Sequence, residues 1–386
     1  MDAKVVEQRP QKNRMDKKTK KRTSPLPPSF ASLPNEILLN CLARISRYHY
    51  SSLSLVSKSF HSLISSPELY QSRSWMGNTE PYLYLCQRLP TYDRWFFVNK
   101  TLITDGCIKD DELSLSPIAL SSSAPSKAST VAVGFEIYQI GGTINDDKRP
   151  SSAVHVFDCR THTWRDAPSM TVPRKRAKSA FIDGKIFVIG GIEKELSSMN
   201  WAEVFDPKTQ TWKPLPSPCD DAKVQLCRGK LYVNSELKRY EYDSNQGRWK
   251  CFPKVSLRNG PWCFIENVNF SVLGGKFMWY DSERRKWFMV EGLEDLYTKC
   301  IIYYGRLRLA NYGRKLVILW DLPVPVPEGK MRKRYSQKNK KIIWCAVIKL
   351  KRRIGFSGLE IWGEIEQSNA VLTLHSSFKF LSCSTV

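Results

Sequence analysis

The chain has 386 residues, of which 42% are hydrophobic, so it is long enough for two or three domains and a sizeable core. No apolar run approaches the ~20 residues of a membrane-spanning helix, and the amino terminus lacks the apolar segment of a signal peptide. The eleven cysteines form no C-x-x-C pair, which favours neither a disulfide framework nor a zinc site. We therefore expect a protein of the nucleus or cytoplasm with reduced thiols.

The excess of positive charge is concentrated in two segments. Of the net charge of +23, residues 1–22 contribute +6 and residues 329–353 contribute +11. We expect residues 1–28 to be a disordered basic tail, which is either a nuclear-import signal or a solvated arm. The import signal would consist of Lys17, Lys18, Lys20, Lys21 and Arg22. In the second segment, residues 331–341 are expected to form an exposed loop, because their positive charges repel one another.

Residues 29–74 have the pattern of three short helices. Pro34 suits the first turn of a helix, and Pro67 opens the third. Apolar residues recur at three- and four-residue steps in two stripes, one of Ile37, Leu38, Cys41, Leu42 and Ile45 and one of Leu53, Val56, Phe60, Leu63 and Ile64. So small a module buries little surface, and we expect it to keep apolar residues for a partner. The pattern of apolar residues is equally consistent with a helical cap that packs on the next domain and binds no partner.

Residues 75–386 are expected to be all-β. In the clearest unit, at 178–216, Asp183-Gly184 is a two-residue turn signal, residues 186–189 form a strand, and Gly190-Gly191 ends it. Similar units lie at about 128–170, 222–253 and 260–290, with a degenerate copy at 300–366. Gly274-Gly275 lies too near Asp281 to be the same glycine pair, so we interpret it as a hairpin turn.

The units share an aspartate and a later tryptophan, and two of them also have a glycine pair after the second strand. These positions are Gly141, Gly142, Asp158, Trp164, Gly190, Gly191, Asp206, Trp212, Asp243, Trp249, Asp281 and Trp287. The tryptophans are 48, 37 and 38 residues apart, and four strands in such a period are typical of a β-propeller. The alternative is a β-sandwich in which the spacing recurs by chance.

Ring closure is predicted from strands at both ends of the domain. Residues 81–86 and 94–98 provide two strands of a blade, and residues 370–374 and 378–382 provide the other two, so 81–99 and 368–386 share one blade. Residues 114–130 are a Ser-rich connector in this interpretation, and the basic loop is an insertion between the second and third strands of the fifth copy. The total is six blades, with five or seven left open.

Two motifs resemble known modules. The glycine pair, aspartate and tryptophan resemble the kelch repeat, whereas Leu33-Pro34-x-Glu36-Ile37-Leu38 and Leu53-x-x-Val56-Ser57-Lys58-x-Phe60 resemble the F-box. From residue 30 onward the layout is similar to that of the plant F-box/kelch-repeat proteins. The resemblance implies that the F-box binds the Skp-type adaptor of a cullin-RING ubiquitin ligase and that the propeller holds the protein to be degraded. The adaptor contacts it implies are Leu33, Pro34, Ile37, Leu38, Cys41, Leu42, Ile45, Leu53, Val56, Ser57, Phe60 and Leu63.

Catalytic chemistry is not indicated. The five histidines form no group at metal-ligand spacing, which argues against the copper site of some kelch-type oxidases, and no cofactor is expected. The recurring aspartates are better explained as acceptors for turn N–H groups. We therefore expect a non-catalytic substrate receptor of a ubiquitin ligase. The alternative is a nuclear scaffold that binds nucleic acid through its basic segments, but these have few of the aromatic residues on which bases stack.

Overall fold

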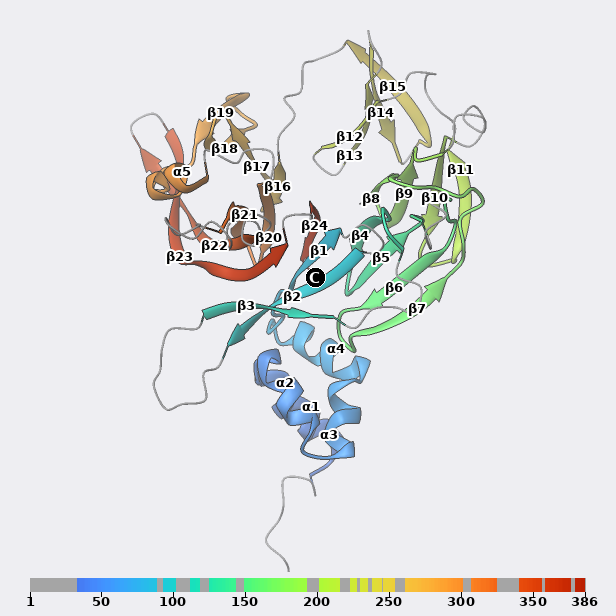
Figure 1. Ribbon diagram of the computed structural model, residues 1–386, viewed down its shortest axis with the longest axis vertical. Helices are drawn as coiled ribbons and strands as arrows, with labels where there is room; N and C mark the ends of the chain where they lie inside the picture. Colours follow the sequence, from blue (N-terminus) through green and yellow to red (C-terminus); the bar gives the residue numbers. More distant parts are fainter. Residues whose placement is uncertain are drawn as a thin grey trace, which may run out of the picture.

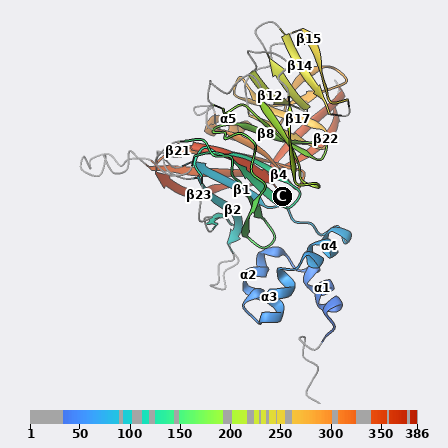
Figure 2. The same cartoon turned by 90° about the vertical axis from the view of Figure 1, so that its right-hand side faces the viewer.

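A computed structural model of the chain places a helical module at one end of the molecule and a ring of β-sheets at the other (Figures 1 and 2). The structure describes residues 33–88, 93–101, 112–118, 125–143, 149–192, 201–215, 223–227, 230–234, 238–244, 246–253, 261–300, 307–324, 340–355, 358–375 and 379–385. In this part of the chain, no helix has both the length and the apolar character needed to span a bilayer.

The helical module contains four α-helices and one short 3-10 helix. They are α1 (Asn35–Arg44), η2 (Arg47–His49), α2 (Tyr50–Ser54), α3 (Lys58–Ile64) and α4 (Pro67–Trp75). Pro34 precedes α1, and its carbonyl oxygen accepts hydrogen bonds from the N–H groups of Ile37 and Leu38. The third predicted helix does begin at Pro67, where the missing N–H of proline is not needed.

The second predicted helix is two helices, which corrects the sequence interpretation. The chain leaves α2 after Ser54 and begins α3 at Lys58. Ser57 has an extended backbone, and its side-chain oxygen accepts a hydrogen bond from the N–H of Phe60 at 3.2 Å, which is a typical N-cap. The break turns Val56 away from the stripe in which the sequence pattern placed it.

The ring consists of six four-stranded antiparallel sheets, so the prediction of a six-bladed propeller is confirmed. The first blade has β4 (Ser129–Val133), β5 (Glu136–Ile140), β6 (Val154–Asp158) and β7 (Thr163–Ala167). The second has β8 (Lys178–Ile182), β9 (Lys185–Ile189), β10 (Ala202–Asp206) and β11 (Thr211–Leu215). The third has β12 (Lys223–Cys227), β13 (Lys230–Asn234), β14 (Lys238–Asp243) and β15 (Arg248–Pro253).

The remaining blades differ more from the sequence prediction. The fourth has β16 (Trp262–Ile265), β17 (Val268–Leu273), β18 (Lys276–Asp281) and β19 (Lys286–Met289), and is followed by α5 (Glu294–Cys300). The fifth has β20 (Arg308–Tyr312), β21 (Lys315–Pro323), β22 (Lys340–Gly355) and β23 (Gly358–His375). The sixth joins β24 (Lys379–Thr385) to β1 (Leu83–Arg88), β2 (Asp93–Thr101) and β3 (Glu112–Pro117).

The sixth blade is composite, as predicted, but its strands are divided differently. One strand comes from the carboxyl terminus and three from the amino-terminal side, in the order β24-β1-β2-β3. The segment 370–374, assigned to this blade from the sequence, is instead the end of β23, where Ala370 lies opposite Trp344. Its place is taken by β3, part of the stretch expected to be a connector, whose Leu113 and Leu115 are buried.

The fifth blade is longer than predicted, because β22 and β23 pair from Lys340–His375 to Gly355–Gly358. Lys340 and Lys341 therefore belong to a strand and not to the predicted basic loop. Lys341 is buried, and its ammonium group forms an ion pair with Asp321 at 3.0 Å. The rest of the predicted loop connects β21 to β22, as expected, but residues 325–339 lie outside the described residues.

Several neighbouring blades contact one another through their first strands, whereas β8 of the second blade contacts β13, the second strand of the third. β16 contacts β20, β20 contacts β24, β24 contacts β4, and β4 contacts β8. A buried ion pair also joins the first and second blades: the guanidinium of Arg174, in the connection between them, lies 3.0 Å from the carboxylate of Glu203 on β10. The same carboxylate accepts hydrogen bonds from the N–H and hydroxyl groups of Thr171. This cluster fixes the connecting segment against the second blade.

Two turns follow from their residue types. Asp183 and Gly184, between β8 and β9, both have positive φ (48° and 78°), as the type I′ turn predicted for them requires. Gly274-Gly275 is the turn between β17 and β18, also as predicted. Gly190 and Gly191 follow β9 with φ of 70° and 74°, a backbone region that side-chain-bearing residues rarely adopt.

The two glycines of the second blade differ in the space around them, which gives a first prediction. A Cβ atom at Gly190 would meet nothing within 4 Å, whereas one at Gly191 would lie 2.6 Å from the carbonyl oxygen of Lys175. Gly190→Ala should therefore cost about 1 kcal/mol through its φ alone. Gly191→Ala should cost roughly 1–3 kcal/mol more, because backbone atoms of a neighbouring segment must move. Thermal melting of the two variants beside the parent measures the difference, and equal midpoints would contradict this assignment.

Closure of the ring gives a second prediction. Removing residues 376–386 deletes β24 and leaves one edge of β1 unpaired, while its other edge still pairs with β2. We expect this truncated chain to aggregate, because an unpaired edge strand is a template for pairing with other chains. A chain that lacks residues 1–28 is the control and should remain soluble. A soluble truncated chain that unfolds cooperatively, judged by size-exclusion chromatography and thermal melting, would show that β24 is not needed for closure.

Candidate functional site

The apolar residues of the helical module divide into a core and an exposed set. The core consists of Leu38, Leu42, Ala43, Tyr50, Phe60, Leu63, Ile64, Leu69 and Tyr70. Four large apolar side chains of the module are instead exposed, namely those of Ile37 (49%), Leu55 (87%), Val56 (66%) and Trp75 (83%). Large apolar residues exposed together on one small module are typical of a surface that another molecule covers.

The twelve residues predicted to bind the adaptor fall into three groups. Leu38, Leu42, Phe60 and Leu63 are buried in the core of the module; Leu33, Cys41, Ile45 and Leu53 are partly buried; and Pro34, Ile37, Val56 and Ser57 are exposed. The buried group holds the helices together, and Leu42 has no accessible surface to offer a partner. The surface that remains for binding comes from the start of α1 and from the α2–α3 turn. We call Pro34, Ile37, Leu55 and Val56 the outer apolar set.

Two exposed residues were missed by the sequence analysis. Leu55 lies beside Val56 in the turn that was expected to be helical, and its exposure follows from the break at Ser57. Trp75 ends α4, which extends beyond the third piece expected around Pro67 to Tyr70. The N-cap preference of Ser57 is the sequence signal that could have revealed the break.

Inside the module, a buried arginine holds three elements together. The guanidinium of Arg73, on α4, donates to the carbonyl oxygens of Ala43 (3.2 Å) and Ile45 (2.5 Å) at the end of α1. Its other amino group lies 3.2 Å from a carboxylate oxygen of Glu80, in the segment that leads to β1. The same oxygen accepts a hydrogen bond from the backbone N–H of Arg47 at 2.7 Å. One carboxylate thus orders the helices relative to the chain entering the ring.

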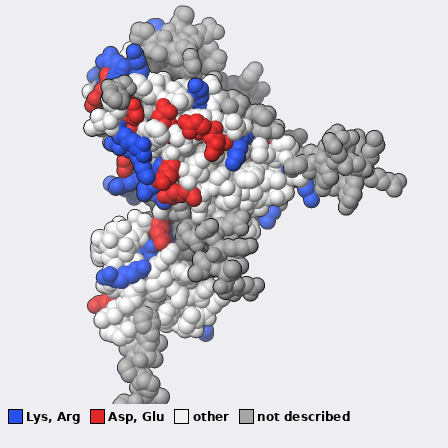
Figure 3. Space-filling view, turned by 90° about the vertical axis from the view of Figure 1, so that its left-hand side faces the viewer, with Lys and Arg blue, Asp and Glu red and all other residues white. Residues whose placement is uncertain are grey.

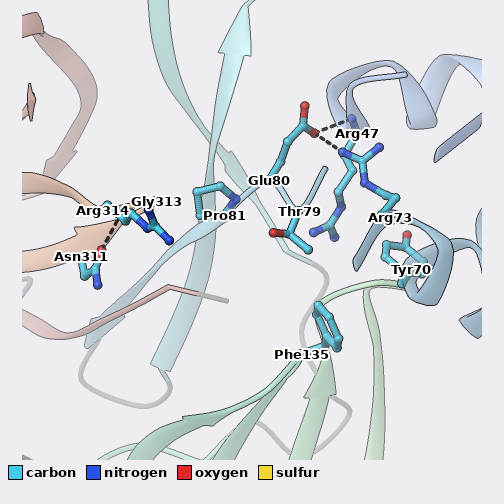
Figure 4. Close-up of a pocket in the computed structure, with 10 residues that line it drawn as sticks. All are labelled: Arg47, Tyr70, Arg73, Thr79, Glu80, Pro81, Phe135, Asn311, Gly313 and Arg314. Carbon is cyan, nitrogen blue, oxygen red and sulfur yellow. Dashed lines mark hydrogen bonds and ion pairs between the residues drawn. The ribbon is translucent and has the colours of Figure 1, made fainter. Parts of the chain in front are cut away.

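The module is also bound to the ring. The guanidinium of Arg47 donates to the carbonyl oxygen of Cys159 at 3.0 Å, and the hydroxyl of Tyr70 donates to that of Arg160, also at 3.0 Å. Both acceptors lie in the turn between β6 and β7. Burial raises the pKa of the Tyr70 hydroxyl, which therefore remains a donor. Figure 4 shows these side chains where the helices, the linker and the ring meet.

His162, in the same turn, adds no charge to the junction. Its ring lies against aromatic side chains of the first and sixth blades, 5.1 Å from Phe97 and 5.8 Å from Phe157. Burial and the neighbouring Arg47 lower the pKa of His162 to about 4, so the ring is neutral near pH 7. The positive charge at the junction therefore comes from arginine.

The four recurring aspartates each end the third strand of a blade and accept hydrogen bonds from backbone N–H groups of the following turn. Asp158 accepts from Arg160, Asp206 from Lys208, Asp243 from Gln246 and Asp281 from Glu283, at 2.8 to 3.1 Å. The residue four positions after each aspartate has positive φ: His162, Gln210, Gly247 and Arg285. This arrangement is a turn structure and does not resemble a catalytic site.

The recurring glycines and tryptophans lie at equivalent places in their blades. Gly141, Gly142, Gly190 and Gly191 follow the second strand, and Trp164, Trp212, Trp249 and Trp287 lie on the fourth. The indole N–H of Trp212 donates to the carbonyl oxygen of Pro168, in the connection from the first blade, at 2.8 Å. Trp249 lies 6.1 Å from Trp201 of the preceding blade. These contacts join neighbouring blades.

Several sequence predictions lie partly or wholly outside the described residues. They are the disordered tail at residues 1–28, with its possible import signal Lys17 to Arg22, and most of the basic loop at 331–341. Within the ranges that the structure describes, no three His, Cys, Asp or Glu side chains gather in a way that could hold a metal ion.

Comparisons with known proteins identify both parts of the chain. The F-box domain matches residues 30–72, and the family described as FKB95, Kelch-repeats domain, matches residues 95–372. Three F-box/kelch-repeat proteins of Arabidopsis thaliana are 44%, 42% and 40% identical to the chain. The alignments cover 94%, 92% and 96% of this chain and 94%, 92% and 98% of those relatives. A solved structure, that of YjhT, is similar over 69% of this chain and 90% of its own chain. Its TM-score is 0.40 and its sequence identity is 13%. The two family matches and the Arabidopsis relatives show that the chain, with its helical module and six blades, belongs to the F-box/kelch-repeat family.

Proposed function

We propose that the protein is the substrate-recognition subunit of a cullin-RING ubiquitin ligase. In this proposal the F-box binds a Skp-type adaptor, and the propeller holds the protein to be ubiquitinated. The observation that carries the proposal is the outer apolar set, which is exposed on a helical module whose opposite side is fixed to the ring. The proposal places the protein in the nucleus or cytoplasm, and it requires no active site in this chain.

The outer apolar set has the composition of an interface centre. Burying the side chain of Ile37, Leu55 or Val56 under a partner stabilises a complex by roughly 1.5–3 kcal/mol per residue, before the costs of association. The module also carries few charges on the face seen in Figure 3, whereas Lys, Arg, Asp and Glu side chains gather on the flank of the ring above it. Depletion of charge is typical of the centre of a protein–protein interface.

The junction gives the proposed receptor a defined shape. Arg47 and Tyr70 bind the turn between β6 and β7, and Glu80 binds both Arg47 and Arg73. A target held on the propeller would therefore keep a limited range of positions relative to the adaptor. Such positioning raises the local concentration of the target lysines near the ubiquitin-conjugating enzyme, which is how a non-catalytic subunit accelerates transfer.

The end of the propeller that faces away from the F-box is the proposed target-binding face. The F-box contacts the turn that joins the third and fourth strands of the first blade, so the connections between second and third strands lie at the other end of the antiparallel sheets. These connections include the segment after Gly190-Gly191 and the basic loop after β21. Loops on a rigid scaffold are where binding specificity usually resides.

The adaptor interaction gives a third prediction. The double change Ile37→Ala, Val56→Ala removes two exposed side chains and should weaken binding to a purified Skp-type adaptor about a hundredfold, if each is an interface anchor. The melting temperature should barely change, because neither side chain belongs to the core of the module. Isothermal titration calorimetry measures the affinity.

The matched control is Ile354→Ala, which removes an equally aliphatic and 91% exposed side chain from β22 of the propeller. It should bind the adaptor like the parent. Two results would count against the proposal: a parent protein that binds no such adaptor, or a double variant that binds as tightly as the parent. Salt-dependent binding of the parent to DNA or RNA would instead favour the scaffold alternative.

A further inference from the structure

A cavity of about 280 Å³ lies at the junction between the F-box and the propeller (Figure 4). Its wall is shared by both modules: Arg47 and Tyr70 come from the F-box, Phe135 from the turn between β4 and β5, and Arg314 from the turn between β20 and β21. The volume is just below that of typical small-molecule sites, which measure roughly 300–1,000 Å³. It would suit a ligand of the size of a single substituted ring.

The cavity is positively charged, and one of its arginines remains without a carboxylate. Arg73 forms an ion pair with Glu80 at 3.2 Å, and Arg314, whose side chain is 83% exposed, lies 3.5 Å from Glu266. The third arginine, Arg47, has no carboxylate paired with its guanidinium among the residues that the structure describes. Glu80 binds the backbone N–H of Arg47 and not its side chain.

Arg47 is nevertheless a buried cation, because it is only 7% exposed. Its Nη2 group donates to the carbonyl oxygen of Cys159, and its charge lies over the rings of Tyr82 and Tyr70, 4.1 and 5.1 Å from their centroids. Within the described ranges, its Nε and Nη1 groups have no acceptor. Figure 4 shows the head of Arg47 directed away from Glu80 and toward Thr79, Tyr70 and Phe135. Cation–π contacts of this kind offset only part of the cost of burying a charge.

The remaining wall is aromatic. The rings of Tyr70 and Phe135 lie 6.4 Å apart and at 53° to each other. A free guanidinium edge beside two rings matches a ligand with a carboxylate at one end and a flat apolar body at the other. We propose that this cavity binds a small aromatic monocarboxylate, whose carboxylate accepts hydrogen bonds from Arg47 and whose ring packs on Phe135 and Tyr70.

The single uncompensated charge favours a monoanion over a phosphate dianion. Phosphate sites usually combine several cations or backbone N–H groups, and Glu80 lies close enough to repel a second negative charge. The linker also limits the depth of the cavity. At Gly313, where φ is 58°, an added Cβ would lie 2.9 Å from the side chain of Pro81, so linker and blade already touch there.

The ligand would contact both modules at once, and this has a measurable consequence. A ligand that binds the folded, docked arrangement and not the unfolded chain raises the melting temperature, and the increase grows with the logarithm of the ligand concentration above Kd. The inference does not depend on the proposed ligase role, because it concerns a site within this chain.

The test uses the full chain and three probes: benzoate, phenylacetate and cinnamate, each paired with its uncharged carboxamide. Ligand-observed NMR and thermal melting should show binding of at least one carboxylate, at least about tenfold tighter than its carboxamide, because only the anion neutralises Arg47. Arg47→Met should abolish this preference. The matched control Arg314→Met should keep it, because that arginine is exposed and lies beside Glu266.

A second variant keeps the proposal testable if Arg47→Met does not fold. Phe135→Trp retains the guanidinium but fills the space beside it, and it should prevent carboxylate binding. The proposal is overturned if no carboxylate is preferred over its amide, or if Phe135→Trp binds the probes as the parent does. Inorganic phosphate that binds as tightly as the best carboxylate would also overturn it, because the cavity would then select charge alone.

Discussion

The arrangement of the whole protein depends on how two buried arginines are accommodated at one place in the chain. Arg73 is 3% exposed and Arg47 is 7% exposed, and both lie where α1, α4 and the linker meet the ring. The carboxylate of Glu80 pairs with the guanidinium of Arg73 and accepts a hydrogen bond from the backbone N–H of Arg47. Removing one partner of a buried ion pair commonly costs about 3–5 kcal/mol, because the other charge stays buried. The junction is therefore a specific, polar contact, and small changes in its geometry would alter the angle between the F-box and the propeller.

The F-box has two separate surfaces, one that contacts the ring and one that faces solvent, and its small size explains why both exist. Its core uses one side of each helix, with Leu38 and Leu42 on α1 and Phe60 on α3. The α2–α3 turn and the start of α1 are left to face solvent, whereas η2 and α4 supply Arg47 and Tyr70 to the ring. A module of this size has too little interior to bury all of its apolar residues. The residues left outside are those available to a partner.

The repeated strands and turns of the blades could be predicted from the sequence, whereas contacts between distant segments of the chain could not. Strand period, turn glycines such as Gly184 and the tryptophan spacing identify six blades, because each unit repeats one local pattern. The fourth strand of the closing blade, β3, was missed, because the surrounding serines suggest a connector. Its Leu113 and Leu115 nevertheless alternate with polar residues, as a half-buried strand requires. The bond from Arg47 to Cys159 spans 112 residues of sequence, and no local pattern encodes it.

The composite blade also has a consequence for the order in which the protein is made. β24 is the last strand of the chain, and it pairs with β1, which directly follows the F-box. During synthesis the amino-terminal helices leave the ribosome first, so the F-box can fold while the propeller still lacks the strand that closes it. Until β24 has been synthesised, the edge of β1 remains available to other strands, including those of neighbouring nascent chains. A chain released before β24 would therefore carry a folded F-box attached to an open sheet.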